Sequence, residues 1–442
     1  MDYHAYTPEH FDQIAYLERL SDDYRFGMKV VSQILPFRVN RYVVDELIDW
    51  DNVPDDPMFR LVFPDPGMLL PEHFERVAEL VRTGADRQSL ENTAHEIRLA
   101  LNPHPAGQQT MNVPSLDGQS LSGLQHKYRE TVLFFPRMGQ TCHSYCTFCF
   151  RWPQFVSEKD LRINAPRTPG LYAYLRRHPE ITDLLVTGGD PLVMKAANLA
   201  EILEPLLDPE FENLQTIRIG SKALAFWPYR FLTDRDADDL LRLFERLVAG
   251  GKHLALMAHF NHWRELETQA VRHAIERVKA TGAIIRTQSP LVAHVNDDWS
   301  VWARMWQLQV RLGMVPYYMF VARNTGARHY FAMPLERCWE IYRQALKRLS
   351  GLARTVRGPS MSAGPGKVEI QGVSDICGEK VFVLRFIQGR NPDWVQRPFF
   401  ARYDSKAIWL DELKPAFGKK EFFYSAEYDA MQKDAGLKGG VV

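Results

Sequence analysis

The sequence predicts an α/β fold: an open, partial TIM-type barrel of six β/α units, preceded by a helical N-terminal region and followed by a C-terminal α+β extension. Short runs of β-branched and aromatic residues alternate with longer segments of helical periodicity, which indicates parallel βαβ units with helices outside. Six units are too few for the eight of a closed barrel. The 442 residues and 45% hydrophobic content allow a large core and two or three domains.

The N-terminal region, residues 1–119, is helical in pattern. Its clearest helix spans 72–81, where apolar side chains recur on one face and Pro71 marks the start. A polar stretch over 101–120 is rich in Pro, Gly and Asn. This composition predicts a linker and the first domain boundary.

The middle region, residues 120–350, carries the six β/α units. Its predicted strands lie at 132–135, 183–187, 216–219, 253–257, 283–286 and 315–321. Its predicted helices lie at 169–177, 197–207, 237–249, 265–280, 299–312 and 335–349. Trp299, Trp302 and Trp306 are spaced as one helix face, and we expect them in the core. In barrels of this type chemistry gathers in the loops that follow the strands, so the unusual residues there should face one cavity.

Residues 351–442 form the predicted C-terminal extension. The stretch 357–367 is rich in small residues and predicts a loop, whereas 368–371 and 381–386 have the character of strands. The polar tail that ends in Lys-Gly-Gly-Val-Val is expected to be mobile.

Charge and hydropathy exclude several classes of protein. The 54 basic and 54 acidic residues cancel, so nothing suggests a nucleic-acid surface or a polybasic membrane patch. The sequence contains no apolar run of about eighteen residues, and the first residues lack the basic and apolar segments of an export signal. We therefore expect a cytoplasmic protein with neither a membrane nor a nucleic acid as partner.

Three cysteines, Cys142, Cys146 and Cys149, stand in a CxxxCxxC pattern after the first predicted strand. Thiolates are the usual ligands of iron–sulfur clusters, and one loop with this spacing can supply three of the four that a cubane cluster needs. The other cysteines, Cys338 and Cys377, are isolated in sequence. One iron would therefore stay open to a small-molecule ligand.

Other metal and disulfide interpretations are weaker. A structural zinc site normally has four Cys or His ligands, and His143 could join the cysteines only with strain. Five cysteines make an odd, sparse set that argues against a disulfide framework. His259 and His262 follow a predicted strand without evident carboxylate ligands nearby, so we expect cofactor contact or hydrogen bonding from them.

The cysteine pattern, with Phe148 before the third cysteine, resembles the signature of radical S-adenosylmethionine enzymes, in which the methionyl amine and carboxylate of the cosubstrate occupy the open iron. The pair Gly188 and Gly189, followed by Asp190, ends the second predicted strand, and glycines let backbone approach a ligand closely. Alone this is an ordinary turn sequence, but beside the cysteines it matches the segment that holds the methionyl amine in that superfamily. The resemblance extends the S-adenosylmethionine site to Ser221, His259 and Gln288.

A narrower resemblance, to the lysine 2,3-aminomutase family, covers about residues 120–370. Its motifs are His126-Lys-Tyr128, Cys142 to Arg151, Leu185 to Pro191, Ile217-Arg-Ile-Gly220, His259-Phe-Asn-His262, Gln288-Ser289 with Val295-Asn-Asp297, and Pro316-Tyr-Tyr318. The family implies pyridoxal phosphate, held as an imine by a lysine after a glycine-rich loop. Lys367 takes that place, and imine formation needs its amine deprotonated. Lys127 and Tyr128 match residues near the pyridoxal ring and phosphate, whereas a basic residue of the family appears here as Thr131.

The resemblance also implies the substrate contacts. Arg151 matches the arginine that binds the α-carboxylate, which a planar guanidinium can hold through two parallel hydrogen bonds. At the distal end the lysine enzymes have two aspartates, whereas this chain has Arg323 at the first position and Ser360 or Ser362 at the second. A cation repels a distal ammonium and attracts a distal carboxylate. We therefore expect glutamate or another acidic amino acid rather than lysine, as in the glutamate 2,3-aminomutase branch.

The leading hypothesis is an isomerase: a radical 2,3-aminomutase that moves an α-amino group to the β carbon with a 4Fe-4S cluster, S-adenosylmethionine and pyridoxal phosphate. Its expected partners are a small-molecule amino acid, an electron donor such as flavodoxin or ferredoxin, and a second copy of the chain in a homo-oligomer. One alternative keeps the radical chemistry without amino migration and leaves Lys367 incidental. Others are a lysine 2,3-aminomutase and a noncatalytic iron–sulfur or zinc-binding module.

Overall fold

One mixed sheet dominates the computed structural model, which describes residues 1–156, 158–165 and 168–435. Within these residues the sheet has eleven strands in the order β15-β14-β13-β12-β11-β10-β9-β8-β7-β6-β5. The strands are β5 Leu124–Tyr128, β6 Thr131–Phe134, β7 Asp183–Val186, β8 Thr216–Ser221, β9 His253–His259, β10 Ile284–Leu291, β11 Val315–Val321, β12 Arg357–Ser362, β13 Gly366–Ile376, β14 Glu379–Gly389 and β15 Pro398–Arg402. Two small ribbons pair β1 Ala5–Tyr6 with β2 Val39–Asn40, and β3 Ser115–Leu116 with β4 Gln119–Ser120.

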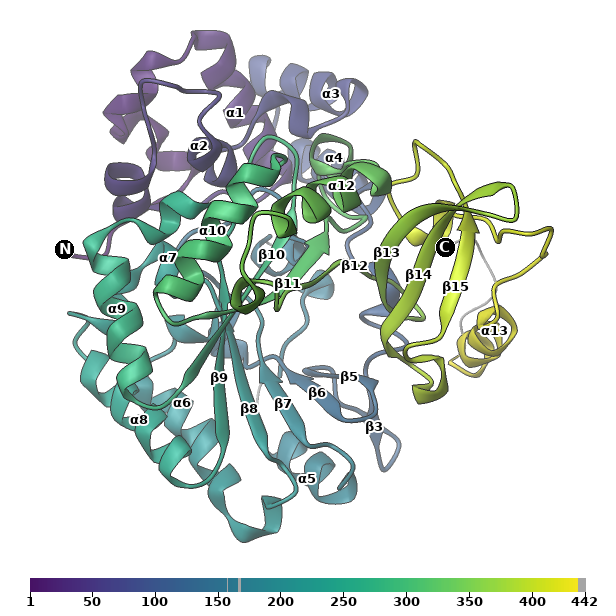
Figure 1. Cartoon of the computed structure of the whole chain (residues 1–442). Helices are drawn as coiled ribbons and strands as arrows, with labels where there is room; N and C mark the ends of the chain where they lie inside the picture. The colour runs from purple at the N-terminus through teal and green to yellow at the C-terminus, as the bar shows by residue number, and fades with distance from the viewer. Residues whose placement is uncertain (157, 166–167, 436–442) are drawn as a thin grey trace.

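The helices cover the sheet and its ends (Figure 1). They are α1 Asp22–Ile34, α2 Pro57–Val62, α3 Pro71–Arg82, α4 Arg87–Ala100, α5 Pro169–Arg177, α6 Ala196–Leu203, α7 Ala223–Phe226, α8 Ala237–Ala249, α9 Gln269–Ala280, α10 Trp299–Arg311, α11 Arg328–Phe331, α12 Leu335–Leu346 and α13 Ser425–Asp434. No helix in the described part of the chain is both long and apolar enough to cross a membrane.

The parallel strands β6 to β11 confirm the six predicted strands, and the predicted helices alternate with them. Strands of a parallel sheet are buried on both faces, and Leu184, Ile217 and Ile219 are accordingly inaccessible to solvent. Leu240 and Leu243 are buried on the apolar face of the amphipathic helix α8. This arrangement confirms the α/β class, while the partial-barrel shape and the domain boundaries stay predictions.

The small-residue stretch 357–367, predicted as a loop, is largely strand. Residues 357–362 form β12, a seventh strand in the parallel run beside β11. The chain then turns back into β13, which is antiparallel to β12. Its Gly, Pro and Ser composition conceals this strand because the pairing comes from distant residues, and local propensity is weak against such tertiary context. The sheet therefore continues from the barrel strands into the C-terminal extension.

The N-terminal region packs over the ends of the parallel strands, where α1 to α4 lie in Figure 1. Helix α3 begins at Pro71 as predicted and buries Val77 and Ala78. Of the predicted tryptophan stripe, Trp302 and Trp306 are buried, whereas Trp299 is half-buried and covered by the guanidinium of Arg348, 3.6 Å from its ring centroid. The predicted mobile tail ends in residues 436–442, which lie outside the described residues.

Candidate active site

One cavity of about 300 Å³ lies at the carboxyl ends of the parallel strands and collects most of the predicted site residues. Its lining includes Cys142, Cys146, Cys149, Arg151, Gly188, Gly189, Asp190, Ser221, His259, Gln288, Arg323 and Lys367. Of the two candidate serines, Ser362 lines the cavity, whereas Ser360 is buried and lies close to the Met319 carbonyl. Lys127 and Tyr128 are absent from the lining.

The three cysteines occupy the loop after β6, and their thiols are free and half-buried. Burial raises the pKa of all three, that of Cys149 to about 11, because a thiolate is poorly solvated there. Among the described residues, no three Cys, His, Asp or Glu side chains are grouped to hold one metal ion. A cubane cluster does not need such a group, because each of its thiolates binds a different iron. The donor set therefore fits the cluster better than a single zinc ion.

The N-terminal region braces the cysteine loop from behind. The Tyr145 amide donates to the Arg38 carbonyl at 2.8 Å, and the Thr147 amide donates to the Leu61 carbonyl at 3.0 Å. The fully buried Asn40 donates from Nδ2 to the His143 carbonyl at 3.3 Å. The backbone of the loop is therefore set by residues far earlier in the chain.

The glycine segment after β7 packs against the same loop. A Cβ on Gly189 would lie 2.3 Å from the Thr141 carbonyl oxygen, so only glycine fits. The Asp190 carboxylate is hydrogen-bonded within the protein: Oδ2 accepts a hydrogen bond from Ser221 Oγ at 2.9 Å and one from the Lys222 amide at 2.8 Å. Asp190 and Ser221 thus join the ends of β7 and β8 beside the cysteines.

A buried ion pair that the sequence analysis does not predict supports the neighbouring loops. Lys222 Nζ lies 2.6 Å from Oε1 of the fully buried Glu265 and also donates to Asn261 Oδ1 at 2.9 Å and to the His259 carbonyl at 3.2 Å. Burial, and secondarily the Lys222 charge, hold the pKa of His259 well below its usual range. His259 therefore presents a neutral imidazole to the cavity. His262 instead accepts from the Arg264 amide at 3.3 Å, a hydrogen-bonding role.

Lys367 lies in β13 with its amine 4.0 Å from the Tyr318 ring centroid and 3.0 Å from Gln388 Oε1. Burial, followed by the charges of Arg218 and Arg357, lowers its pKa well below 10.5. A deprotonated amine is what imine formation requires. The position and chemistry of Lys367 therefore fit a pyridoxal phosphate site.

Two further basic side chains lie at the turn before Lys367. Lys127 Nζ donates to the Ala363 carbonyl, and Arg390 Nε donates to the Gly364 carbonyl at 2.9 Å. Neither side chain has a carboxylate partner among the described residues. Burial, followed by the charges of Arg390 and Arg323, lowers the pKa of Lys127 well below its usual range, so the positive charge of this pair comes from Arg390. This pair suits a phosphate monoester, although the sequence analysis does not single out Arg390 because it comes from the distant strand end of β14. Thr131, where the family has a basic residue, donates instead to Asp183 Oδ2 at 3.0 Å.

Arg151 and Arg323 are the unpaired charges of the cavity. Arg151 Nη1 and Arg323 Nε are buried without a hydrogen-bond partner among the described residues. Burial lowers the pKa of Arg323 to about 10, and burial together with the Arg323 charge lowers that of Arg151 to about 9. Both guanidinium groups stay charged near neutral pH. Two unpaired buried cations favour a ligand with two anionic groups.

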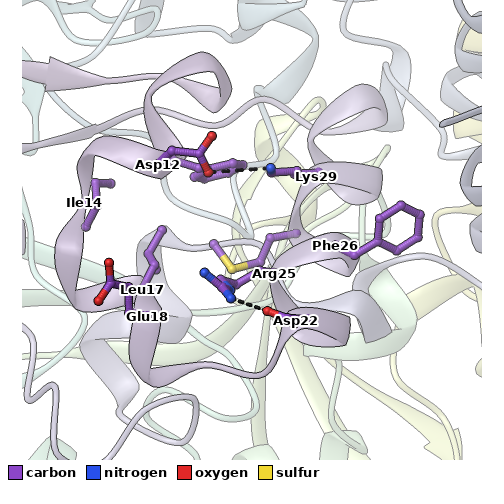
Figure 2. Close-up of a pocket in the computed structure, with 10 residues that line it drawn as sticks. Asp12, Ile14, Leu17, Glu18, Asp22, Arg25, Phe26 and Lys29 are labelled. Atoms are coloured by element: carbon purple, nitrogen blue, oxygen red, sulfur yellow. Dashed lines mark hydrogen bonds and ion pairs between the residues drawn. The ribbon is translucent and has the colours of Figure 1, made fainter. Parts of the chain in front are cut away.

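A second hollow, of about 400 Å³, lies in the N-terminal region and is lined by none of the predicted site residues (Figure 2). Both of its cationic side chains are already paired: Lys29 lies 3.6 Å from Asp12, and Arg25 pairs with Asp22. It therefore offers neither the thiols nor the unpaired arginines of the cysteine cavity.

Comparison with known proteins agrees with the cysteine motif. No protein-family model matches the chain. It is 32% identical over 400 residues to a protein of Aquifex aeolicus (strain VF5) named "Putative L-lysine 2,3-aminomutase", covering 90% of this chain and 93% of that one. It is 24% identical over 367 residues to the L-lysine 2,3-aminomutase of Bacillus subtilis (strain 168), covering 83% and 67%.

Among solved structures, the chain resembles a radical SAM methyltransferase from Sphaerobacter thermophilus, with 17% identity and a TM-score of 0.38 over 55% of this chain and 71% of that one. A TM-score this low supports no conclusion. The Aquifex relative, by contrast, matches nearly the whole length of both chains. The chain therefore belongs to the radical S-adenosylmethionine, lysine 2,3-aminomutase family.

Proposed function

We propose that this protein is an isomerase that moves the α-amino group of an acidic amino acid, with glutamate as the first candidate, to the β carbon. The observation that carries the substrate class is the pair of buried, unpartnered guanidinium groups, Arg151 and Arg323, in the cavity that also holds the three thiols and Lys367. A lysine substrate would bring a second cation against Arg323 and be repelled. A dicarboxylic amino acid would neutralise both arginines.

Three groups would complete the site. The cysteines would hold a 4Fe-4S cluster, Lys367 would hold pyridoxal phosphate, and the segment Gly188–Asp190 with His259 and Gln288 would face S-adenosylmethionine. When bound, the cluster and S-adenosylmethionine supply a radical that removes a hydrogen atom, and pyridoxal phosphate supplies a conjugated carrier for the migrating nitrogen. A one-electron donor such as flavodoxin or ferredoxin is the protein partner that this chemistry needs.

The chain's own residues have distinct tasks in this proposal. Arg151 would bind the α-carboxylate and Arg323 the distal carboxylate, which together orient the substrate. Lys127 and Arg390 would hold the cofactor's phosphate at the turn before Lys367. The neutral amine of Lys367 would be ready to bond to the cofactor without first losing a proton to solvent.

We also propose that the parallel strands form the expected open barrel. Support comes from the lining of the cavity, to which each of the six strands β6 to β11 or the loop after it contributes residues. A concave inner face would bring these contributions together, with α5 to α10 outside.

The test is a substrate screen with anaerobically reconstituted protein, S-adenosylmethionine, pyridoxal phosphate and dithionite. Glutamate, aspartate and lysine are supplied separately, and 3-amino products and deoxyadenosine are measured by mass spectrometry. We expect 3-aminoglutarate from glutamate. Conversion of lysine with no conversion of either acid would reject the acidic-substrate assignment while leaving the aminomutase chemistry in place.

A second candidate, radical chemistry without amino migration, is favoured by one observation: Lys127 and Tyr128, expected beside pyridoxal phosphate, do not line the cavity. Lys367→Ala separates the two candidates. Loss of product formation with the mutation supports the aminomutase. Full substrate turnover by Lys367→Ala supports the second candidate.

A further inference from the structure

Phe150 contacts both unpartnered arginines. The Cζ atom of Arg151 lies 4.9 Å from the centroid of the Phe150 ring, and that of Arg323 lies 5.0 Å from the same centroid. The two guanidinium groups can therefore be no farther apart than about twice that distance. Like charges this close repel each other in a poorly solvated site, so a ligand that binds both relieves the repulsion.

A hydrogen bond joins the two loops that carry these arginines. Nε1 of Trp152, the residue after Arg151, donates to Thr325 Oγ1 at 3.0 Å. The Thr325 amide in turn donates to the Arg323 carbonyl at 2.9 Å. Trp152 is 2% exposed and Thr325 is 8% exposed, so water cannot readily replace this bond.

A third segment, formed by Leu101 and Asn102 directly after α4, holds the Arg323 loop in place. The Gly326 amide donates to the Leu101 carbonyl at 2.9 Å, and Asn102 Nδ2 donates to the Asn324 carbonyl at 2.7 Å. Gly326 has φ +63°, and a Cβ there would lie 3.2 Å from the Trp152 ring. The backbone of the loop therefore packs closely against the Trp152 ring at Gly326.

We propose that Thr325 is a positioning residue which, with Trp152 and Phe150, fixes the spacing of Arg151 and Arg323, so that the site selects dicarboxylates by chain length. The inference rests on the proposed function, because it takes the two arginines as the carboxylate sites. A fixed spacing weakens the binding of a ligand that is one methylene too long or too short, by about tenfold or more in dissociation constant. A spacing that can relax does not.

The experiment measures the dissociation constants of succinate, glutarate and adipate by calorimetry on the reconstituted protein. We expect the wild type to bind one acid at least tenfold more tightly than the acids one methylene longer or shorter. Thr325→Val keeps the shape of the side chain but loses the hydroxyl, and should reduce that ratio to threefold or less. Thr325→Ser keeps the hydroxyl and should retain the wild-type ratio.

The ratio of dissociation constants distinguishes positioning from general damage to the site, because general damage would weaken the binding of all three acids alike. Phe150→Leu provides a second variant and should also flatten the preference, at an iron and sulfide content equal to the wild type. The inference would be overturned if Thr325→Val kept the wild-type preference for one chain length. It would also be overturned if Thr325→Ser lost that preference as completely as Thr325→Val. If the wild type binds the acids without a length preference, the inference fails alone; if it binds none of them, the proposed function fails.

Discussion

Lys367 has no carboxylate partner within salt-bridge distance in the described part of the chain, although it is half-buried and its amine is poorly solvated. Its amine contacts the face of the Tyr318 ring. The nearby charges of Arg218 and Arg357 lower the pKa of the amine further. Such a site favours the uncharged amine and disfavours the ammonium. The same feature that would prepare Lys367 for the proposed bond to pyridoxal phosphate therefore costs folding stability.

Lys367→Met should stabilise the protein from which pyridoxal phosphate has been removed, by about 1–3 kcal/mol near pH 7. Folding lowers the pKa of Lys367 below 10.5. At any pH between the folded pKa and 10.5, the unfolded chain therefore binds more protons than the folded one. The wild type should therefore gain stability relative to the variant as pH rises toward 10. Thermal unfolding near pH 7 and near pH 10 measures this, and a pH-independent difference between the two proteins would contradict it.

Arg151→Lys should lower kcat/KM for the acidic substrate at least tenfold, which is about 1.4 kcal/mol. An ammonium cannot form the two parallel hydrogen bonds that a guanidinium makes with a carboxylate, nor can it keep the contact of Arg151 with the Phe135 ring in the same form. Steady-state kinetics with glutamate provide the measurement. The exposed Arg311→Lys serves as the control, and equal kinetics for both variants would reject the carboxylate role.

At the scale of the element, the decisive contacts join loops that follow different strands. The cysteine loop after β6 is packed against the glycine segment after β7, and the loop after β8 is tied through Lys222 to the loop after β9. The sequence predicts each of these loops, because a strand pattern precedes each one and Gly188, Gly189 and the cysteines stand out. It does not predict β12, whose place in the parallel run depends on its pairing with β11, a strand distant in sequence.

Gly189→Ala should destabilise the cysteine loop, because the new Cβ would lie 2.3 Å from the Thr141 carbonyl oxygen. We expect a loss of about 1–3 kcal/mol of stability and a lower iron and sulfide content after reconstitution. Thermal unfolding and metal analysis measure the two effects. Gly351→Ala is the matched control, since a Cβ there meets nothing within 4 Å; a Gly189→Ala protein indistinguishable from it would show that the close approach does not matter.

At the scale of the whole molecule, residues between Cys142 and Lys367 line one cavity, and the N-terminal region braces its cysteine loop. Sequence patterns predict the residues that carry unusual chemistry, such as Cys146, Arg151 and Lys367, because their types and spacing are local signals. They do not predict Arg390, Glu265 or the bond from Trp152 to Thr325, because these act only through tertiary contacts between residues far apart in sequence.

Asn40→Ala should weaken the whole assembly by about 1–3 kcal/mol, because buried carbonyls would lose their hydrogen-bond donor. Asn40 Nδ2 donates to the His143 carbonyl and, at 2.7 Å, to the Phe226 carbonyl, so it joins the N-terminal region to the cysteine loop and to helix α7. Denaturant unfolding measures the change, with Asn92→Ala on the exposed surface of α4 as control. Equal stability of the two variants would contradict the bracing role of Asn40.

The bracing of the cysteine loop has a consequence for biosynthesis. Arg38, Asn40 and Leu61 leave the ribosome before the cysteines, and Gly189 follows them by only one strand and one helix. A nascent chain that has been translated through β8 thus already contains both supports of the thiol loop, long before Lys367 is made. Iron and sulfide can then be delivered before the chain is complete, whereas the cofactor proposed for Lys367 has to wait until β13 is made.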